Sequence, residues 1–436
     1  MQLFGCYSYV QCTPFPWRER FERWDAKSVA SGEVHHASRF SQRFHAKDRV
    51  QILRVLFFFG WSIREVGGAE FSVLGLAEGL LRAGHSVAIA DVQKQGSTEK
   101  SIGSLQVPYW SIPRAPEPKD VRSSAAFARG VWQTLAVLRE FRPDIFSVQS
   151  PVFQTALAVG ASRLPHHWHL AITVRGSDIR VIPKTFPLLG PWQEHLFERA
   201  DAVIAVSQSL LRDALNLYPS MRDKAQVIPN SLDASWFDKP VVQPTDDERH
   251  VLFVGRFHIV KGIDILLRAW SLLQGHVAGI NLWLVGEGEE LGSLRSLSDH
   301  LGVSKSVRFK GYRAQEELPS LYRAAEIVVL PSRNEGLPRT ALEAGACGAI
   351  CVGARTGGIP ETILDGVTGF LVDPESPEAL AQGMLRALCL PESDKRRMSA
   401  AARAHIQQNF NQETMVARYE QLFQSILRKR TAQEMA

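Results

Sequence analysis

Short apolar runs alternate with amphipathic helical stretches along most of this chain, and the alternation occurs twice. Such alternation predicts βα units, in which a mostly parallel sheet is covered by helices on both faces. We expect strands at 52–59, 86–90, 145–148, 170–174, 202–206 and 226–228, and again at 251–254, 281–285, 307–310, 327–330 and 349–352. The fold class is therefore α/β, with two Rossmann-like domains facing each other over a central cleft, and ligands bind beyond the carboxyl ends of such strands.

A polar, proline-bearing stretch, KPVVQPTDDER, separates the two repeats. Polar residues and prolines rarely continue a strand or helix, so this stretch is the best linker candidate. We therefore expect a first domain at 51–240 and a second domain at 249–410. Residues 1–50 show no apolar period and carry eight Lys and Arg against five Asp and Glu. We interpret them as a basic, disordered extension.

Composition and charge exclude several classes of function. A chain of 436 residues is too long for one core, and a net charge of +5 is too small to indicate nucleic-acid binding. Five cysteines without a CxxC pair predict neither a disulfide framework nor a zinc site. No apolar run approaches the roughly 20 residues of a membrane helix, and the start lacks a secretory signal. We expect a cytoplasmic protein, and its basic excess permits a peripheral contact with the anionic inner face of the membrane.

Two cations and two carboxylates in the second half have the chemistry that a nucleotide sugar requires. Arg256 and Lys261 lie between a predicted strand and a helix, where anions bind favourably. Glu335 follows a later strand, and Glu343 lies within the next helix. A carboxylate accepts two hydroxyl hydrogen bonds, which suits a ribose or hexose diol. The alternatives are two solvated surface cations, an acid that stabilises a helix N-terminus and an acid on a solvated helix face.

These residues belong to a long series of ordered motifs. In the second half the motifs are VGRFHIVKGIDILLRA, LVGEGEE, VRFKGY, VLPSRNEGLPRTALEAGACG, TGGIPETI and DGVTGFLV. In the first half they are EVGGAEFSVLGLAEGLLRAGHSV, RPDIFSV, TVRGSDI, ADAVIAVSQSL and VIPNSLD. The series resembles glycosyltransferase family 4, the retaining enzymes of the GT-B architecture, over roughly residues 51–430. The resemblance implies transfer of a hexosyl group from a nucleoside-diphosphate sugar to a glycan or lipid-linked glycan, in cell-surface polysaccharide or glycolipid biosynthesis.

The resemblance also implies a role for each site residue. Arg256 and Lys261 would neutralise the donor pyrophosphate, so that the nucleoside diphosphate departs without a metal. Glu335 would contact hydroxyls of the transferred sugar, and Glu343 would hold the ribose diol. Further donor contacts are expected from Gly336, Leu337, Gly68, Tyr312 and Arg313. No D-x-D motif is present, and we expect no metal and no cofactor. A helix at 411–430 is expected to return to the first domain and couple the two.

The donor contact expected from Gly68 has an alternative explanation in the geometry of the turn. Gly68 lies in the glycine turn after the first predicted strand, where a turn that needs a positive φ would also select glycine.

Arg175 departs from the family pattern. Many members carry a histidine just before the glycine that is Gly176 here. Histidine exchanges a proton near neutral pH, whereas arginine does not serve as a base. Our hypothesis is that Arg175 helps to hold the phosphate or the transferred sugar and that the chemistry needs no side-chain base. The resemblance implies that the leaving phosphate itself takes the acceptor's proton. The nearby Asp178 is better explained as a helix cap or as a partner of Arg175 than as a catalytic acid.

The acceptor side is poorly specified by the sequence. Residues 180–192, RVIPKTFPLLGPW, combine cations with apolar residues and would suit either a lipid-linked acceptor at a membrane or a packed loop. Two other functions stay open. One is a non-catalytic sugar-nucleotide-binding subunit, to which only Arg175 points, and the other is a sugar-nucleotide epimerase on the same fold. A pyridoxal-dependent phosphorylase is disfavoured, because no lysine lies in a matching context.

Overall fold

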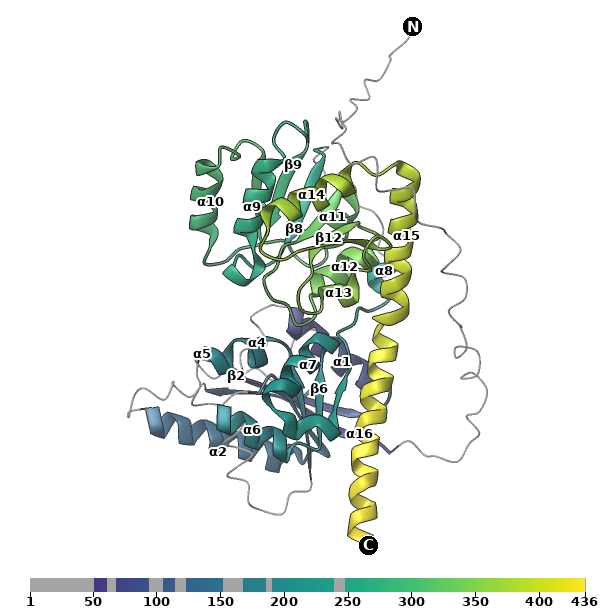
Figure 1. Cartoon of the computed structure of the whole chain (residues 1–436). Helices are drawn as coiled ribbons and strands as arrows, with labels where there is room; N and C mark the ends of the chain where they lie inside the picture. The colour runs from purple at the N-terminus through teal and green to yellow at the C-terminus, as the bar shows by residue number, and fades with distance from the viewer. Residues whose placement is uncertain are drawn as a thin grey trace.

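The computed structural model describes residues 51–60, 68–93, 105–113, 123–151, 168–185, 190–238 and 248–435. Within them the chain forms two parallel sheets, each covered by helices, with α15 (Glu392–Asn409) and α16 (Gln412–Met435) running along one side of both (Figure 1). The α/β fold class with two Rossmann-like sheets is thus confirmed. The predicted extension at 1–50 lies outside the described residues.

The first sheet has seven parallel strands in the order β3-β2-β1-β4-β5-β6-β7. They are β1 (Arg54–Phe59), β2 (Ser86–Gln93), β3 (Tyr109–Pro113), β4 (Ile145–Gln149), β5 (His169–Val174), β6 (Ala202–Ala205) and β7 (Ala225–Val227). The helices of this half are α1 (Gly68–Arg82), α2 (Ser123–Phe141), α4 (Ser177–Arg180), α5 (Ile182–Thr185), α6 (Gly190–Arg199) and α7 (Gln208–Leu217). The short helix α8 (Ser235–Asp238) follows them in the chain and packs against the second half (Figure 1). Phe57, Phe58 and Phe59 are fully buried, because helices cover both faces of this central strand.

The second sheet has six parallel strands in the order β10-β9-β8-β11-β12-β13. They are β8 (His250–Val254), β9 (Asn281–Val285), β10 (Val307–Gly311), β11 (Ile327–Leu330), β12 (Cys351–Ala354) and β13 (Gly369–Val372). Its helices are α9 (Ile263–Leu272), α10 (Leu291–His300), α11 (Leu318–Ala324), α12 (Arg339–Ala346), α13 (Ile359–Thr362), α14 (Pro377–Leu388) and α15. The amphipathic pattern of α9 buries Ile263, Leu266 and Trp270 against this sheet.

The strand order determines where a ligand can bind. In the second sheet β8 lies between β9 and β11, so the order reverses at β8. The loops that follow β8 and β11 therefore lead to helices on opposite faces and leave a crevice at the carboxyl edge of the sheet. Lys261 follows β8, and Glu335 follows β11. The topology thus brings together two loops that are distant in sequence.

Three features of the first domain and the sheet edges differ from the expectation. The predicted strands omit β3 and β13, which are edge strands, where pairing on one side supports short sequences with a weak apolar pattern. The loop interpretation of 180–192 is wrong for its described part, which holds α5 and the start of α6. Pro183 and Pro191 each stand in the first turn of these helices, where the missing N–H breaks no helical hydrogen bond.

The chain crosses between the two halves twice, and the crossings are hydrogen-bonded to each other. Leu232 N–H donates to Phe410 O at 2.9 Å, and Gln412 N–H donates to Leu232 O at 3.0 Å. Beyond the second crossing, α16 packs on α1 in the first half, where Tyr419 and Phe423 are buried in the core. The helix that we expected at 411–430 spans Gln412–Met435.

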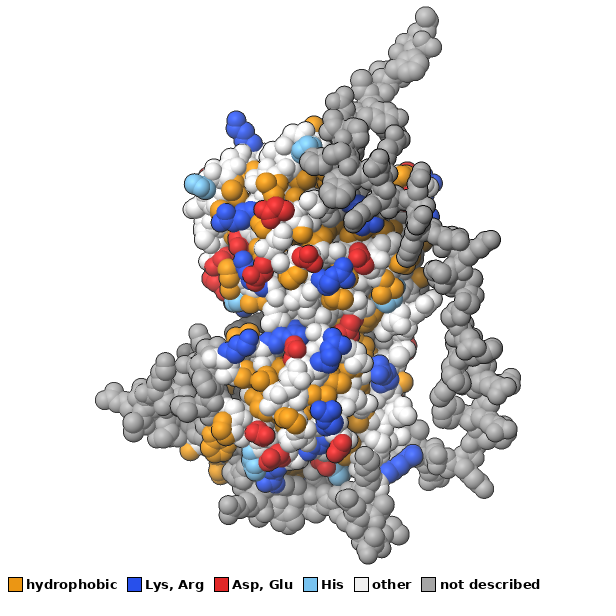
Figure 2. All heavy atoms as spheres, viewed as in Figure 1, with side chains coloured by type: hydrophobic (Ala, Val, Ile, Leu, Met, Phe, Trp, Pro, Cys, Tyr) orange, Lys and Arg blue, Asp and Glu red, His pale blue; other side chains and the backbone are white. Residues whose placement is uncertain are grey.

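The surface between the two halves is polar on the side shown in Figure 2. Lys and Arg side chains lie on the first half where it faces the second. Among the described residues, no helix has the length and the hydropathy that crossing a bilayer requires.

Candidate functional site

Lys261 and Glu335 meet at the point where the strand order of the second sheet reverses. Lys261 Nζ lies 2.6 Å from Glu335 Oε1, and Ser332 Oγ donates to the same oxygen at 2.8 Å. The side chains of Lys261 and Glu335 are 30% and 12% exposed. Partial burial lowers the screening by water, so their charges act more strongly on a bound ligand than those of a surface pair would. Two predicted site residues are therefore in direct contact.

The loop that carries Lys261 needs glycine at its end. A 3₁₀ turn, η4 (Ile259–Lys261), begins after His258, whose Nδ1 accepts from Val260 N–H at 3.1 Å. Gly262 ends the turn with a φ of 64°. A Cβ at Gly262 would lie 2.1 Å from Pro331 O, so a larger residue would push the loops after β8 and β11 apart.

Arg333 ties these two loops together. Its guanidinium donates to both carboxylate oxygens of Asp264 at 2.8 Å and to Ile259 O at 2.8 Å. Its backbone N–H donates to Val260 O at 2.8 Å. Burial raises the pKa of Asp264, but the hydrogen bonds and charge of Arg333 outweigh that effect, and the pKa is lowered overall. This ion pair holds the Lys261 and Glu335 loops at a defined spacing.

Arg256 lies at the rim of the site. Its side chain is 72% exposed, and its Nε lies 3.6 Å from Glu289 Oε2. The other oxygen of Glu289 lies 3.4 Å from His258 Nε2. The structure therefore pairs Arg256 with an acid of the neighbouring loop, which follows β9, and its role in phosphate binding stays a prediction.

Glu343 is buried, and its carboxylate already has two donors. Oε1 accepts from Arg339 Nε at 2.6 Å, and Oε2 accepts from Tyr322 OH at 2.9 Å. Burial and the neighbouring Glu343 raise the pKa of Tyr322 well above its usual value, so the phenol keeps its proton. A ribose diol would have to replace one of these donors, and the predicted contact with ribose remains a prediction.

Arg175 is a cation with an unused donor. It follows β5, and its Nη2 and Nη1 donate to Gln149 Oε1 at 2.7 Å and to Asn230 Oδ1 at 3.1 Å. Its Nε is buried and has no hydrogen-bond partner among the described residues. Burial lowers the pKa of this guanidinium from its usual value, but an arginine still carries its proton near neutral pH. The group can therefore attract an anion, and it cannot act as a base.

Asp178 stabilises the turn that follows Arg175. Its carboxylate accepts from Gly176 N–H at 2.7 Å, from Arg175 N–H at 2.9 Å and from Ser150 Oγ at 2.9 Å. Burial raises the pKa of Asp178, and these hydrogen bonds oppose the shift. The contacts favour the explanation of Asp178 as a partner of Arg175, at its backbone N–H, over a catalytic one.

Gly336 and Leu337 lie where the two halves of the protein touch. A Cβ on Gly336 would lie 1.8 Å from Arg175 O, so the backbone of the first half reaches the segment after β11 only because Gly336 has no side chain. Asn230 Nδ2 donates to Leu337 O at 3.4 Å. Both residues immediately precede the N-terminal end of α12, where backbone N–H groups attract anions.

The remaining predicted residues lie at the edges of the site. Gly68 begins α1. Tyr312 is 59% exposed after β10, and Arg313 Nη1 lies 3.8 Å from Glu317 Oε1. The donor contacts proposed for these three residues stay predictions. No group of three or more His, Cys, Asp or Glu side chains in the described part of the chain is placed to hold a metal ion.

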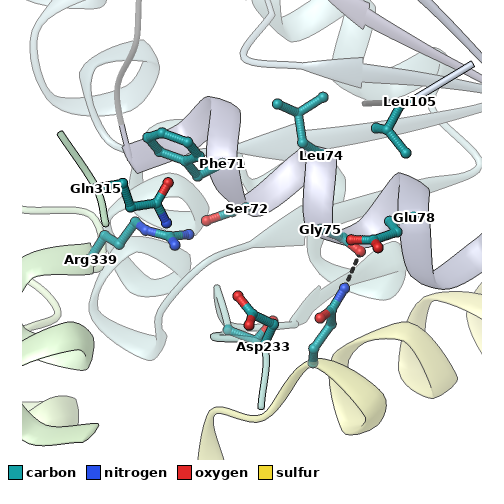
Figure 3. A pocket seen from close by; sticks show the side chains of 11 residues that line it. Phe71, Ser72, Leu74, Gly75, Glu78, Leu105, Asp233, Gln315 and Arg339 are labelled. Atoms are coloured by element: carbon teal, nitrogen blue, oxygen red, sulfur yellow. Dashed lines mark hydrogen bonds between the residues drawn. The ribbon is translucent and has the colours of Figure 1, made fainter. Parts of the chain in front are cut away.

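A cavity of about 240 Å³ lies between α1 and the second half. Figure 3 shows Arg339 and Gln315 on one side of it, opposite Phe71 and Ser72 of α1. The Arg339 guanidinium carbon lies 5.1 Å from the centre of the Phe71 ring, a cation–π distance. Since Arg339 also binds Glu343, this cavity adjoins the acid that we expect to hold ribose.

Sequence reasoning missed four residues that shape the site. They are Arg180, Ser332, Arg333 and Arg339. Three of them lie in the same short segment as Glu335, so their proximity to it could have been inferred from the sequence. Arg180 is far away in the chain, and only the tertiary structure places it here.

Family models match both halves of the chain. The model described as Glycosyltransferase Family 4 matches residues 66–236, and the model described as Glycosyl transferases group 1 matches residues 235–405. An uncharacterized glycosyltransferase of Methanocaldococcus jannaschii is 29% identical over 74% of this chain and 86% of its own length. A D-inositol 3-phosphate glycosyltransferase of Xylanimonas cellulosilytica is 28% identical over 78% of this chain and 87% of its own. An N-acetyl-alpha-D-glucosaminyl L-malate synthase of Bacillus anthracis is 29% identical over 59% and 68%.

Solved structures share the fold. A sucrose-phosphate synthase from Thermosynechococcus elongatus superposes with a TM-score of 0.73 at 21% identity, covering 86% of this chain and 100% of that one. Anabaena HepE in complex with UDP-glucose has a TM-score of 0.67 at 21% identity, covering 87% and 100%. These similarities confirm the predicted GT-B architecture.

Proposed function

The chain belongs to glycosyltransferase family 4 and transfers a sugar from a nucleotide sugar, and we propose that it moves a hexosyl group to a glycan or lipid-linked glycan with retention of configuration. The observation that carries this proposal is the 2.6 Å contact between Lys261 Nζ and Glu335 Oε1. A cation for phosphate and a carboxylate for hydroxyls lie within hydrogen-bonding distance of each other there, beside the N-terminal end of α12.

In this proposal the donor diphosphate lies against Lys261 and the α12 N-terminus, with Arg256 closing over it from the rim. The negative charge on the diphosphate grows as the bond between the anomeric carbon and the phosphate oxygen breaks. Fixed positive groups therefore bind the transition state more tightly than the ground state. Glu335 accepts hydrogen bonds from sugar hydroxyls and orients the anomeric carbon, and Glu343 receives the ribose hydroxyls.

The acceptor hydroxyl attacks from the face that the phosphate leaves. A bond forms between the acceptor oxygen and the anomeric carbon, and the acceptor's proton passes to a leaving phosphate oxygen, so no side-chain base is needed. Arg175 supplies a further positive charge from the first half. The backbone of Gly336 lies close to Arg175 O, and this contact would exclude water from the site and limit hydrolysis of the donor.

A second acceptor class is favoured by the relatives. Two of them are named for small anionic acceptors, an inositol phosphate and a malate. The cavity of about 240 Å³ would admit a molecule of that size, but its lining holds Glu78 and Asp233 as well as Arg339, so the names of the relatives are what favours this class. The second candidate function is therefore hexosyl transfer to a small polar anion.

A lipid-linked acceptor would bring the enzyme to the cytoplasmic face of a membrane. Val181 and Trp192 are both 41% exposed in the segment that we considered for such a contact, and Lys184 is also exposed. Apolar side chains next to a cation suit the interface of an anionic bilayer. Co-sedimentation with anionic but not with neutral liposomes would support this part of the proposal.

Thermal-shift screening against UDP-, GDP- and ADP-sugars tests the donor. A sugar nucleotide at a hundred times its dissociation constant stabilises the protein by about 2.7 kcal/mol. Product analysis with lipid-linked glycans, inositol phosphate and malate then distinguishes the two acceptor classes, and transfer should persist in EDTA. Donor binding without transfer to any acceptor would contradict the proposed reaction. Conversion of the donor to an epimer without an acceptor would also contradict it.

A further inference from the structure

Arg180 of α4 connects the first half to the loop that carries Glu335. Its Nη1 donates to Asn334 Oδ1 at 2.8 Å and to the backbone carbonyl of Glu335. On its own side, Nε donates to Asp213 at 2.6 Å and Nη2 donates to Ser209 Oγ at 2.9 Å. The side chain is 11% exposed. A guanidinium whose donors are used on both sides, in a fixed planar geometry, resists reorientation.

Glu361 of α13, in the second half, reaches in turn to helix α7 of the first half. Its two carboxylate oxygens accept from the backbone N–H groups of Gln208 and Ser209, each at 3.0 Å. These N–H groups form the first turn of α7, where a carboxylate also interacts favourably with the helix dipole. Ser209 thus lies between a cation of the first half and an anion of the second.

These contacts bear directly on the position of Glu335. The Glu335 carbonyl accepts from Arg180 and also from Gly358 N–H at 3.3 Å. A Cβ at Gly357 would lie 1.9 Å from this carbonyl, so the peptide is enclosed tightly. The side chain of the same residue ends 2.6 Å from Lys261. The peptide of Glu335 is therefore held from both halves of the protein, and its carboxylate is held from the second half.

We propose that Arg180 is a positioning residue, which fixes the Glu335 peptide only when the two halves are in contact, and that Glu361 stabilises the same contact through α7. This inference rests on the proposed function, because it assumes that Glu335 orients the transferred sugar. Arg180 itself need not touch the substrate. Its effect on the reaction passes through the Asn334 and Glu335 backbone.

The test compares Arg180→Met with Arg212→Met, which removes an exposed arginine from the neighbouring helix α7. Asn334→Ala and Glu361→Gln weaken the same contact between the halves by changing residues of the second half. They serve as a second test if Arg180→Met folds poorly. Each full-length variant is assayed for kcat, for donor hydrolysis relative to transfer, and for binding of UDP, GDP and ADP by calorimetry. Small-angle scattering without ligand measures the radius of gyration.

We expect Arg180→Met to lower kcat about 10- to 100-fold, since a small misplacement of a reacting group has effects of that size. Affinity for the nucleoside diphosphate should change less than about threefold, because the proposed diphosphate contacts lie in the second half. Hydrolysis should rise relative to transfer, and the radius of gyration should increase. Arg180→Lys, which keeps the charge but loses the fork of donors, should recover only part of the rate.

A kcat of Arg180→Met equal to that of Arg212→Met would overturn the inference. Loss of nucleotide affinity in proportion to kcat would also overturn it, because the residue would then act on the fold of the second half. If the wild-type protein transfers no sugar, the proposed function fails. The scattering comparison still tests whether Arg180 and Glu361 hold the two halves together. Expansion of Arg180→Met and Glu361→Gln relative to Arg212→Met would support the contact, and identical profiles would refute it.

Discussion

The Lys261 ammonium lies 2.6 Å from the Glu335 carboxylate, although the two residues are 74 positions apart in the chain. In the free protein each group satisfies the charge of the other. A donor sugar nucleotide would separate these roles, with phosphate oxygens facing the ammonium and sugar hydroxyls facing the carboxylate. The pair therefore keeps both groups in place before the substrate arrives.

Removing either charge should impair catalysis more than binding. Lys261→Ala and Glu335→Gln should each lower kcat/KM by about 10²- to 10³-fold, since one preorganised electrostatic contact contributes that much. The control is Lys305→Ala, which removes an exposed lysine of the same half. Steady-state kinetics with a sugar nucleotide check the prediction. A kcat/KM of Lys261→Ala within threefold of the control would show that Lys261 takes no part in the reaction.

Gly336→Ala should prevent the two halves from touching. The added methyl would lie 1.8 Å from Arg175 O, so the backbones must move apart. We expect transfer to fall by about 10-fold or more and donor hydrolysis to rise in relative terms. The control is Gly292→Ala in α10, where a Cβ meets nothing within 4 Å and should stabilise the helix by up to about 1 kcal/mol. Unchanged transfer in Gly336→Ala would show that catalysis does not need this contact.

Arg175→Ala should lower kcat about 10- to 100-fold, because its half-buried guanidinium is a positive charge that the first half contributes to the site. Arg175→His should introduce a dependence of turnover on pH between about 5.5 and 7.5, where an imidazole titrates and the arginine does not. The control is Arg199→Ala, an exposed arginine at the end of α6. Measuring kcat as a function of pH tests both variants. Full turnover of Arg175→Ala would show that Arg175 has no role in the catalytic site.

Arg333→Gln should destabilise the protein at neutral pH. The folded-state pKa of Asp264 is lowered, so its ionised form stabilises the fold above the unfolded pKa of about 4, and this stabilisation is lost as the pH falls through the lower folded value. We expect a loss of about 1–2 kcal/mol at pH 7 that shrinks below pH 4. Urea unfolding at pH 7 and pH 3.5 measures it.

The matched control for this prediction is Arg355→Gln, which breaks an ion pair with Asp365 in which both side chains are more than 40% exposed. Exposed pairs contribute about 0–1 kcal/mol, so its effect should be smaller. Equal effects of the two variants would mean that the contact between Arg333 and Asp264 adds nothing specific.

The sequence predicted central elements better than peripheral ones. Strands β1 and β8 have long apolar runs because both of their faces are covered, and such runs are visible in the sequence alone. The edge strands β3 and β13 pair on one side only, and their weaker pattern was missed. The two helices within 180–192 were missed because prolines and glycine mark turns as often as they mark the first turn of a helix.

By itself, the sequence determined the two α/β repeats, the family and the loops that carry the cations and carboxylates. Those features depend on local periodicity and on motifs a few residues long. Only the tertiary structure decided which distant groups meet: Lys261 with Glu335, and Arg180 with the Glu335 peptide. Contacts between loops or domains that are distant in the chain depend on how folded elements are placed, and no local pattern in the chain encodes that placement.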